Sequence, residues 1–201
     1  MLSMSRTPNS RKHETHERIV EVAARAIRRD GYAGVGVADV MKRAGLTHGG
    51  FYAHFDSRDA LIVEALERAG QDSSEAVGRA VARRAAKGAS PFRALVEAYL
   101  SEDHLTALET GCPVAALVSD MPRQSDAVRE VSAQRVKRLV ARVQSTLPRA
   151  SRGAASVVAG TLVGTLQLAR AIGANADGRA VLSAARKALI QQHDTPDEAA
   201  A

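Results

Sequence analysis

The sequence contains few of the residues that define several common protein classes. A single cysteine among 201 residues excludes an internal disulfide and a cysteine-based zinc site. Tryptophan is absent, aromatic residues make up only 3% of the chain, and runs of β-branched residues are sparse. Alanine is the commonest residue, so the composition favours close-packed helices and argues against an all-β sandwich.

Catalytic motifs are also missing. There is no glycine-rich phosphate loop after a predicted strand, no Gly-x-Ser-x-Gly elbow, and no Ser, His and Asp placed to suggest a triad. The histidines and glutamates of residues 13–17 do not have the zincin spacing. We therefore predict that the protein is not an enzyme, and we expect no catalytic residue, no metal site and no cofactor.

Apolar residues do not form a clear membrane segment. Residues 1–10 lack the apolar stretch of a secretory signal. Residues 154–173 are mostly apolar, but they include polar side chains and are rich in alanine and glycine, so we interpret them as a buried helix. We expect a cytoplasmic protein with no membrane partner.

The charges suit an anionic partner without identifying one. Lys and Arg total 28 against 22 Asp and Glu, which gives a net charge of +6. Residues 1–60 contain ten basic and seven acidic residues, a difference of +3, so half of the net charge lies on less than a third of the chain.

Helical periodicity covers most of the chain. A helix from about residue 13 to residue 30 is followed by a glycine, and Ser57 begins a long helix that extends to about residue 86. Between them we predict short helices at 37–44 and 48–54. Later helices are predicted at 92–100, 113–120, 122–148, 149–173 and 177–192, with the arginines and lysines of 122–148 pointing outward.

Residues 31–55 place two short helices around a glycine turn, which is typical of a helix-turn-helix. Gly45 is expected to have a positive φ, and Val40, Leu46 and Phe51 are spaced to form a small core. The outer face of the second helix is then free to enter a groove. It carries compact donors, acceptors and a glycine, namely Thr47, His48, Gly49, Tyr52 and His54.

Residues 31–61 resemble the DNA-binding domain of the TetR family of transcriptional regulators. The resemblance covers about a quarter of the chain, and the other helices agree with the family only in number and length. The matching positions are Gly31-Tyr32, Val37, Val40, Ala44-Gly45-Leu46-Thr47, Gly49, Phe51-Tyr52, His54-Phe55 and Ser57-Arg58-Asp59-Ala60-Leu61.

The resemblance implies an all-α fold. An N-terminal three-helix helix-turn-helix DNA-binding domain would be joined through the fourth helix to a C-terminal helical ligand-binding and dimerisation domain. The implied divisions are a flexible basic arm at 1–12, the DNA-binding domain at 13–60 with its helix-turn-helix at 37–54, the effector-binding and dimerisation domain at 61–193, and a disordered tail at 194–201.

The resemblance also implies roles in binding double-stranded operator DNA. Thr47, His48 and Gly49 would face base edges, Tyr52 and His54 would bind phosphate, and Arg58 would clamp phosphate. Alternatively, Gly49-Gly50 is a loop, the histidines are only solvated, or Tyr52 only packs. The contact surface would further include Gly36, Val37, Gly50 and, on the arm, Arg11 and Lys12, a pair that is equally consistent with simple solvation.

Three positions depart from the family pattern. Gly36 replaces the usual Ser or Thr cap, Ala38 stands where some members have a base-reading arginine, and Gly50 replaces a better helix former. Two consecutive glycines cost an isolated helix about 1 kcal/mol each relative to alanine. We therefore expect the helix at 48–54 to become firm on DNA.

For the C-terminal helices, the resemblance implies a pocket for a small-molecule effector of unknown identity. The composition does not favour a flat multi-ring cation over a small apolar or weakly acidic molecule. Each candidate lining residue is also consistent with ordinary core, and the set is Phe92, Leu95, Tyr99, Leu108, Cys112, Leu117, Met121, Leu166 and Arg170. Cys112 is consistent either with a redox or electrophile sensor or with a buried inert thiol.

The resemblance implies a homodimer, because one recognition helix contacts too few base pairs for useful specificity. The alternative is that the two glycines of this set pack only within one chain. The candidate interface residues are Gly160, Leu162, Gly164, Ala169, Ile172, Val181, Leu182 and Leu189.

Together these features predict a DNA-binding transcriptional regulator, a repressor that a small-molecule effector releases from a palindromic operator. The alternative is an all-helical ligand-binding or interaction protein that does not bind DNA.

Overall fold

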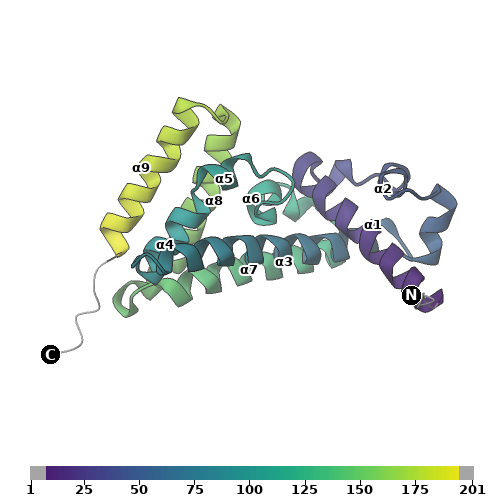
Figure 1. Ribbon diagram of the computed structural model, residues 1–201, viewed down its shortest axis with the longest axis horizontal. Coiled ribbons are helices and arrows are strands. Elements are labelled where there is room, and N and C mark those ends of the chain that lie inside the picture. Colours follow the sequence, from purple (N-terminus) through teal and green to yellow (C-terminus); the bar gives the residue numbers. More distant parts are fainter. Residues whose placement is uncertain (1–7, 195–201) are drawn as a thin grey trace, which may run out of the picture.

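The structure is a computed structural model that describes residues 8–194, and no residue in that range belongs to a β-strand (Figure 1). The predicted all-α fold is therefore confirmed. With 3₁₀ helices labelled η, the elements are α1 (Pro8–Asp30), η1 (Tyr32–Gly34), α2 (Val37–Arg43), η2 (His48–Ala53), α3 (Arg58–Ala85), α4 (Pro91–Tyr99), α5 (Glu102–Thr106), α6 (Pro113–Leu117), η3 (Met121–Arg123), α7 (Asp126–Thr146), η4 (Arg149–Ala154), α8 (Ala155–Ile172) and α9 (Ala176–His193).

The helix-turn-helix region, residues 8–56, packs around a small apolar core. Ile19 and Ile27 of α1 are fully buried, and α1 lies against α2 and the first half of α3. α1 begins earlier than predicted, since Pro8 occupies its first position, where the missing N–H has no helical partner to lose. Residues 8–12 are therefore helical and not part of an arm, and residues 1–7 lie outside the described range.

α3 connects the helix-turn-helix region to the C-terminal helices, as Figure 1 shows. It begins as predicted after Ser57, whose Oγ accepts a hydrogen bond from the N–H of Ala60 (3.1 Å) and so caps the helix. Its first half packs on α1 and its second half on α4 and α7. A movement among the C-terminal helices can therefore reach the helix-turn-helix region through one continuous element.

The C-terminal helices, residues 86–194, surround a second apolar core. The predicted stripe of α4 is confirmed, because Phe92, Leu95 and Tyr99 are buried. Four elements differ from prediction: α6 ends at Leu117, and the predicted helix at 149–173 is divided into η4 and α8. α5 was not expected because its five residues are too few to show periodicity, and α7 begins only at Asp126 because Pro122 lies in the separate turn η3.

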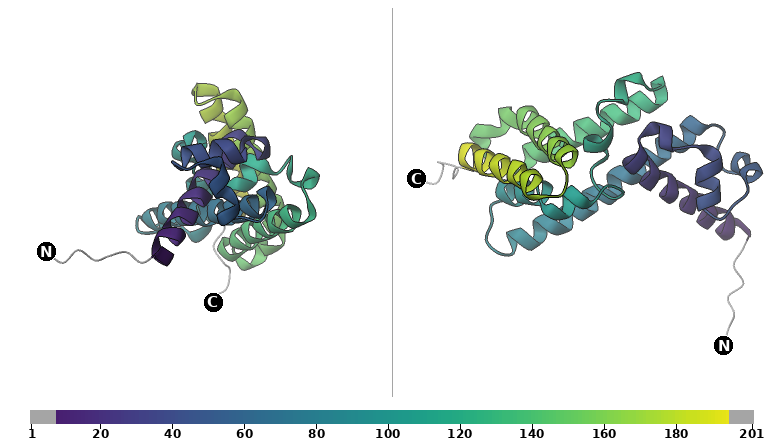
Figure 2. Two further views of the ribbon diagram at one scale, coloured as in Figure 1. Left: turned by 90° about the vertical axis from the view of Figure 1, so that its right-hand side faces the viewer. Right: turned by 90° about the horizontal axis from the view of Figure 1, so that it is seen from above.

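The carboxyl end of α9 is held against α4. The Asp194 carboxylate accepts hydrogen bonds from Ser90 Oγ and from Arg93 Nε, the latter at 3.0 Å. Asp194 was expected in a disordered tail, but these two partners fix its side chain. The rest of the predicted tail, residues 195–201, lies outside the described range. Figure 2 shows α9, in yellow, at the end of the molecule opposite to the helix-turn-helix region.

One segment within residues 8–194 is long and apolar enough to cross a membrane by length and composition alone, namely residues 149–172. The structure packs its main part, α8, against α6, α7 and α9. Val158, Leu162 and Leu166 of α8 are fully buried in this packing. The structure therefore favours the interpretation of residues 154–173 as a core helix.

Candidate nucleic-acid interface and effector cavity

A tight turn places η2 relative to α2. Gly45 has a φ of +74°, a left-handed conformation that glycine adopts without a steric penalty. The N–H of Leu46 donates to the carbonyl oxygen of Met41 (2.9 Å) and closes the turn. Val40 and Phe51 are buried and Leu46 is half-buried. The predicted glycine conformation and the small core between the two helices are both confirmed.

The predicted α-helix at 48–54 is wrong in type, because η2 is a 3₁₀ helix. Thr47 is its N-cap residue, but the hydroxyl makes no capping bond. Gly49 and Gly50 have low helix propensity, and six residues are too few to hold an α-helix without tertiary support. The segment therefore adopts the tighter form, with the N–H of Gly50 bonded to the carbonyl of Thr47 (3.1 Å).

The outer face of η2 is open to solvent. Tyr52 is 73% exposed, and its ring packs edge-on against Phe51 at a centroid distance of 5.3 Å. Its hydroxyl therefore projects into solvent, where it can donate a hydrogen bond to a phosphate oxygen. Among the other predicted contact residues, Val37 and Gly50 are half-buried, and the exposed ones are Gly36, Thr47, His48 and Gly49.

The basic start of α1 lies beside the end of η2. Arg11 and Lys12 are exposed on α1. Lys12 is close enough to His54 to contribute to the lowered pKa of that imidazole, after burial of the ring and the charge of His16. Lys12 therefore lies near the end of η2, one residue after the exposed Arg11.

His54 does not have the geometry expected of a phosphate-binding residue. Its Nδ1 is buried and has no hydrogen-bond partner among residues 8–194. The ring lies 6.0 Å from His16, which stacks on Phe55 (4.5 Å) and contacts Glu64 Oε2 through its Nε2 (2.7 Å). With one nitrogen turned inward and a lowered pKa, the side chain favours a packing role over the predicted phosphate contact.

Arg58 does not have the predicted geometry of a phosphate clamp. Its Nε donates to the carbonyl oxygen of Val35 (2.8 Å), and its Nη2 donates to that of Tyr32. The guanidinium is thus committed to the loop between α1 and α2 and is half-buried there. Its geometry is that of a positioning residue, which fixes the start of α3 against η1.

Two side-chain pairs join the helix-turn-helix region to the C-terminal helices. The hydroxyl of Tyr32 is bonded to Ser132 Oγ on α7 at 3.1 Å, and both groups are buried. Arg29 at the end of α1 pairs with Glu109 in the loop after α5. Neither link was predicted, because partners 80 and 100 residues apart leave no signal in a single sequence.

A small cavity of about 70 Å³ lies among α3, α4, α6 and α7. Three predicted pocket residues line it, namely Leu95, Tyr99 and Cys112. Ser73 and Val77 of α3 line both this cavity and a larger groove of about 310 Å³ between α3, α4 and α5. The cavity therefore includes part of the predicted pocket, and the rest of its wall comes from residues that were not predicted.

Six predicted pocket residues do not line either hollow. Leu108 is on the surface, exposed because the loop after α5 turns outward. Arg170 donates instead to the carbonyl oxygens of His104, Leu105 and Ala107, which fixes that loop on α8. The others are ordinary core, because their helices turn them toward neighbouring apolar helices, and they are Phe92, Leu117, Met121 and Leu166.

His104 lies behind Cys112 and lines the larger groove. The N–H of Cys112 must donate, so His104 Nε2 is the acceptor (2.9 Å) and Nδ1–H donates to the carbonyl of Tyr99 (2.7 Å). The ring is therefore neutral, and burial lowers its pKa to about 4. Burial, followed by the neighbouring Cys112, raises the pKa of Tyr99, so the phenol remains protonated and able to donate.

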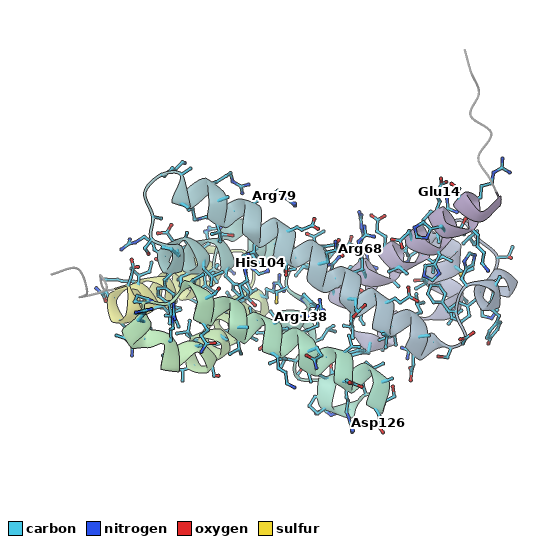
Figure 3. All side chains as sticks on the ribbon, turned by 90° about the horizontal axis from the view of Figure 1, so that it is seen from below. Glu14, Arg68, Arg79, His104, Asp126 and Arg138 are labelled. Atoms are coloured by element: carbon cyan, nitrogen blue, oxygen red, sulfur yellow. The ribbon has the colours of Figure 1, made fainter. Side chains whose placement is uncertain are left out.

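The basic residues of α7 depart furthest from what the sequence predicts. All were expected to point outward, yet Arg135 is only 8% exposed and lines the small cavity together with Arg138 and Arg142. In Figure 3, Arg138 and His104 lie between the ribbons of α3 and α7. The sequence spacing does indicate that Arg135 is buried, because it lies seven residues after the buried Val128 and thus on the same helix face.

The predicted dimer residues divide into two groups. Leu162, Ala169, Leu182 and Leu189 are buried within the single chain, because α8 and α9 pack on each other and on the core. Gly160, Gly164, Ile172 and Val181 remain exposed or half-buried. Two large exposed residues on the same side of α8 were missed, Val157 (69% exposed) and Leu168 (62% exposed).

Residues 8–194 contain no group of three His, Cys, Asp or Glu side chains close enough to hold a metal ion. The structure instead joins an exposed helix-turn-helix to a helical region with an internal cavity. This arrangement is that of an all-helical protein with an N-terminal helix-turn-helix. Residues 19–65 match the family model described as bacterial regulatory proteins, tetR family.

Similar proteins agree with this match. An uncharacterized HTH-type transcriptional regulator of Mycobacterium tuberculosis, Rv0196, is 30% identical over 114 residues, which cover 56% of each chain. The chain thus spans about half the length of this curated relative. Escherichia coli NemR in its reduced form has a similar fold, with a TM-score of 0.74 over 92% of this chain and 99% of that one at 18% identity.

A TetR transcriptional regulator of Chloroflexus aurantiacus is also similar in fold, with a TM-score of 0.69 and 21% identity over 90% of this chain and 96% of that one. At these identities the solved structures show the fold alone, and the match to the family model is confined to residues 19–65. Residues 19–65 are thus similar in sequence to tetR-family regulators, and the chain as a whole is similar to them in fold.

Proposed function

We propose that the protein is a cytoplasmic repressor that binds a palindromic DNA operator as a homodimer and is released by a small-molecule effector. Residues up to about 60 would read the DNA, and residues 61–193 would bind the effector and dimerise. The exposed outer face of η2 carries the proposal: it presents Thr47, His48 and Tyr52 on a turn whose core is fully packed.

Contacts to DNA divide by chemistry. Tyr52, Arg11 and Lys12 offer exposed donors or charges to phosphate, which would contribute affinity to every sequence. Thr47 and His48 lie at the start of η2, where side chains reach base edges when a recognition helix enters the major groove. His48 would therefore contribute to the choice among sequences.

Dimerisation through α8 and α9 is supported by the exposed apolar face of α8. Val157, Gly160, Gly164 and Leu168 follow one another at helical spacing, and a Cβ atom added at either glycine would meet nothing within 4 Å. A second copy could approach closely at the glycines and cover the two large residues. Two copies would place their η2 helices on half-sites about 34–36 Å apart.

Effector control would act through α7. The three cavity arginines and Ser132 belong to this one helix, and Ser132 is bonded to Tyr32 of the helix-turn-helix region. Arg58 in turn binds the carbonyl oxygen of Tyr32, which connects the link to the start of α3. A ligand that shifts α7 would alter this chain of contacts and the spacing of the two η2 helices.

Fluorescence anisotropy with a labelled duplex from the gene's own upstream region tests the proposal. We expect binding whose affinity falls steeply as the salt concentration rises, because phosphate contacts release counterions. Tyr52→Phe should weaken binding to all duplexes, whereas His48→Ala should change the preference among them. An absence of binding at low salt would contradict the proposal and favour the alternative, a helical ligand-binding protein without DNA binding.

A further inference from the structure

The small cavity carries positive charge that no described acidic residue balances. Arg135, Arg138 and Arg142 line it, and no Asp or Glu among residues 8–194 does. Arg142 donates to the carbonyl oxygen of Ser74 (3.0 Å), which satisfies a hydrogen bond but not its charge. Arg135 is the buried member of the three, and burying a charge without an opposite charge costs free energy.

Two polar groups in the cavity wall are buried without partners. Arg135 Nε and the hydroxyl of Tyr99 have no hydrogen-bond partner among residues 8–194, and these residues are 8% and 2% exposed. Buried polar atoms are nearly always paired in native proteins. The Arg135 Nε–H can only donate and the Tyr99 hydroxyl can donate, so one acceptor in the cavity would satisfy both groups.

The neighbouring helix is shaped to accommodate the buried arginine. A Cβ atom at Gly70 of α3 would lie 2.3 Å from Arg135 Nη1 and 2.7 Å from its Cδ. Any other residue at position 70 would therefore displace the guanidinium or force α3 and α7 apart. The side chain of Arg135 thus lies against the backbone of α3 at Gly70.

The remaining wall of the cavity is mainly apolar. Val77, Leu95, Pro113, Val114 and Leu139 line it together with the three arginines. A ligand that fits this wall has a short hydrocarbon body and an anionic end. A planar guanidinium matches the two oxygens of a carboxylate, and about 70 Å³ suits a small molecule better than a bulky phosphorylated one.

We propose that this cavity binds a small apolar carboxylic acid as its anion. The carboxylate is held by Arg135 and Arg138, the Tyr99 hydroxyl donates to one of its oxygens, and the hydrocarbon lies against Leu95 and Leu139. The inference rests on the proposed function only in taking this cavity as the effector site.

Thermal unfolding of the full chain tests the inference with benzoate and hexanoate as probes and with benzamide and hexanamide as uncharged matches. At saturating concentration we expect the two acids to raise the Tm by roughly 5 °C. The two amides should leave it nearly unchanged. Equal effects of acids and amides, or no effect of either acid, would overturn the inference.

Variants of α7 locate the site. Arg135→Met should raise the Tm of the ligand-free protein, because it removes an unpaired buried charge, and should weaken benzoate binding at least about tenfold. Lys137→Gln is the matched control, since it removes one charge from an exposed position of the same helix outside the cavity. It should leave benzoate binding unchanged.

Arg138→Gln keeps the test valid if Arg135→Met does not fold, because Arg138 is exposed at the mouth of the cavity and its replacement should be tolerated. It should also weaken benzoate binding. Wild-type binding by this variant, or by a folded Arg135→Met, would overturn the inference. Acid binding by a protein that binds no DNA would contradict the proposed repressor and leave the inference standing.

Discussion

The helix-turn-helix region and the C-terminal helices both present cationic or donor groups, but the first region exposes them and the second encloses them. In the first region, Tyr52, Arg11 and Lys12 point into solvent around a fully packed core. In the second, Arg135 and Tyr99 are buried in a cavity wall without partners among residues 8–194. The two regions therefore suit anions of different size, an extended polyanion outside and a small one inside.

The largest expected effect is the dependence of stability on pH, through a histidine buried among the C-terminal helices. Burial lowers the pKa of His104 from 6.5 to about 4, with the charge of Arg170 as a smaller cause in the same direction. The unfolded chain therefore takes up a proton first as the pH falls. The free energy of unfolding should therefore fall by on the order of 3 kcal/mol between pH 6.5 and pH 4. Below pH 4 this contribution should level off.

Urea unfolding of the wild type and of His104→Gln at several pH values checks this prediction. The glutamine retains an acceptor for the N–H of Cys112 but does not titrate, so its stability should fall less steeply over this range. Parallel curves for the two proteins would contradict a buried neutral His104.

The next largest effect is expected at Arg58. Arg58→Ala removes two charge-assisted hydrogen bonds to backbone carbonyls, and we expect a loss of about 2 kcal/mol in the free energy of unfolding. DNA affinity should fall for all sequences, because η1 and the start of α3 are no longer fixed. Arg43→Ala, which breaks an exposed ion pair with Asp39, is the control with little change in stability.

Stability data separate the two roles of Arg58. If Arg58→Ala loses DNA affinity while its unfolding midpoint in urea is unchanged, the residue clamps phosphate directly and the positioning role is wrong.

The link between the two regions should respond to a smaller change. Tyr32→Phe deletes the hydroxyl bonded to Ser132, which should cost about 1 kcal/mol of stability, while Ser132 keeps its bond to the carbonyl of Val128 (2.7 Å). If α7 transmits the effector signal, this variant should bind DNA but be less sensitive to effector. Tyr52→Phe is the control, because it removes an exposed hydroxyl and should leave stability unaltered. If Tyr32→Phe keeps full sensitivity to the effector, the proposed role of the Tyr32–Ser132 bond is wrong.

The smallest effect is expected at the two glycines of η2. A Cβ atom at Gly49 would meet nothing within 4 Å, and at Gly50 it would make ordinary contact with Met41 Cε at 3.6 Å. Replacing either with alanine should stabilise the protein by a few tenths of a kcal/mol to about 1 kcal/mol. Gly49→Ala should nevertheless weaken DNA binding, because Gly49 lies on the exposed face, whereas Gly50→Ala should not. Equal DNA affinities would show that close backbone approach is unimportant.

The sequence predicted those features that depend on local patterns. The positive φ of Gly45, the Ser57 cap and the buried stripe of α4 follow from turn chemistry, capping and periodicity. The type of η2 did not follow, because a six-residue segment without a cap bond is decided by its tertiary support.

Positions that depend on distant partners could not be predicted. Arg135 is buried because Gly70, 65 residues earlier, leaves space for it, and Arg58 is drawn to carbonyl oxygens across the loop before α2. The residues that line the cavity could not be told from core residues for the same reason: a residue such as Leu166 is apolar and helical whether it faces a cavity or the core. A single sequence does not show which helix packs against a given residue.

Hydroxyl-radical footprinting on DNA captured by the full-length protein is the decisive test of paired DNA reading by two copies of η2. We expect two protected segments about one helical turn apart on one face of the duplex, one for each η2 of the dimer. A single protected segment, or protection that is the same on unrelated DNA, would contradict this expectation.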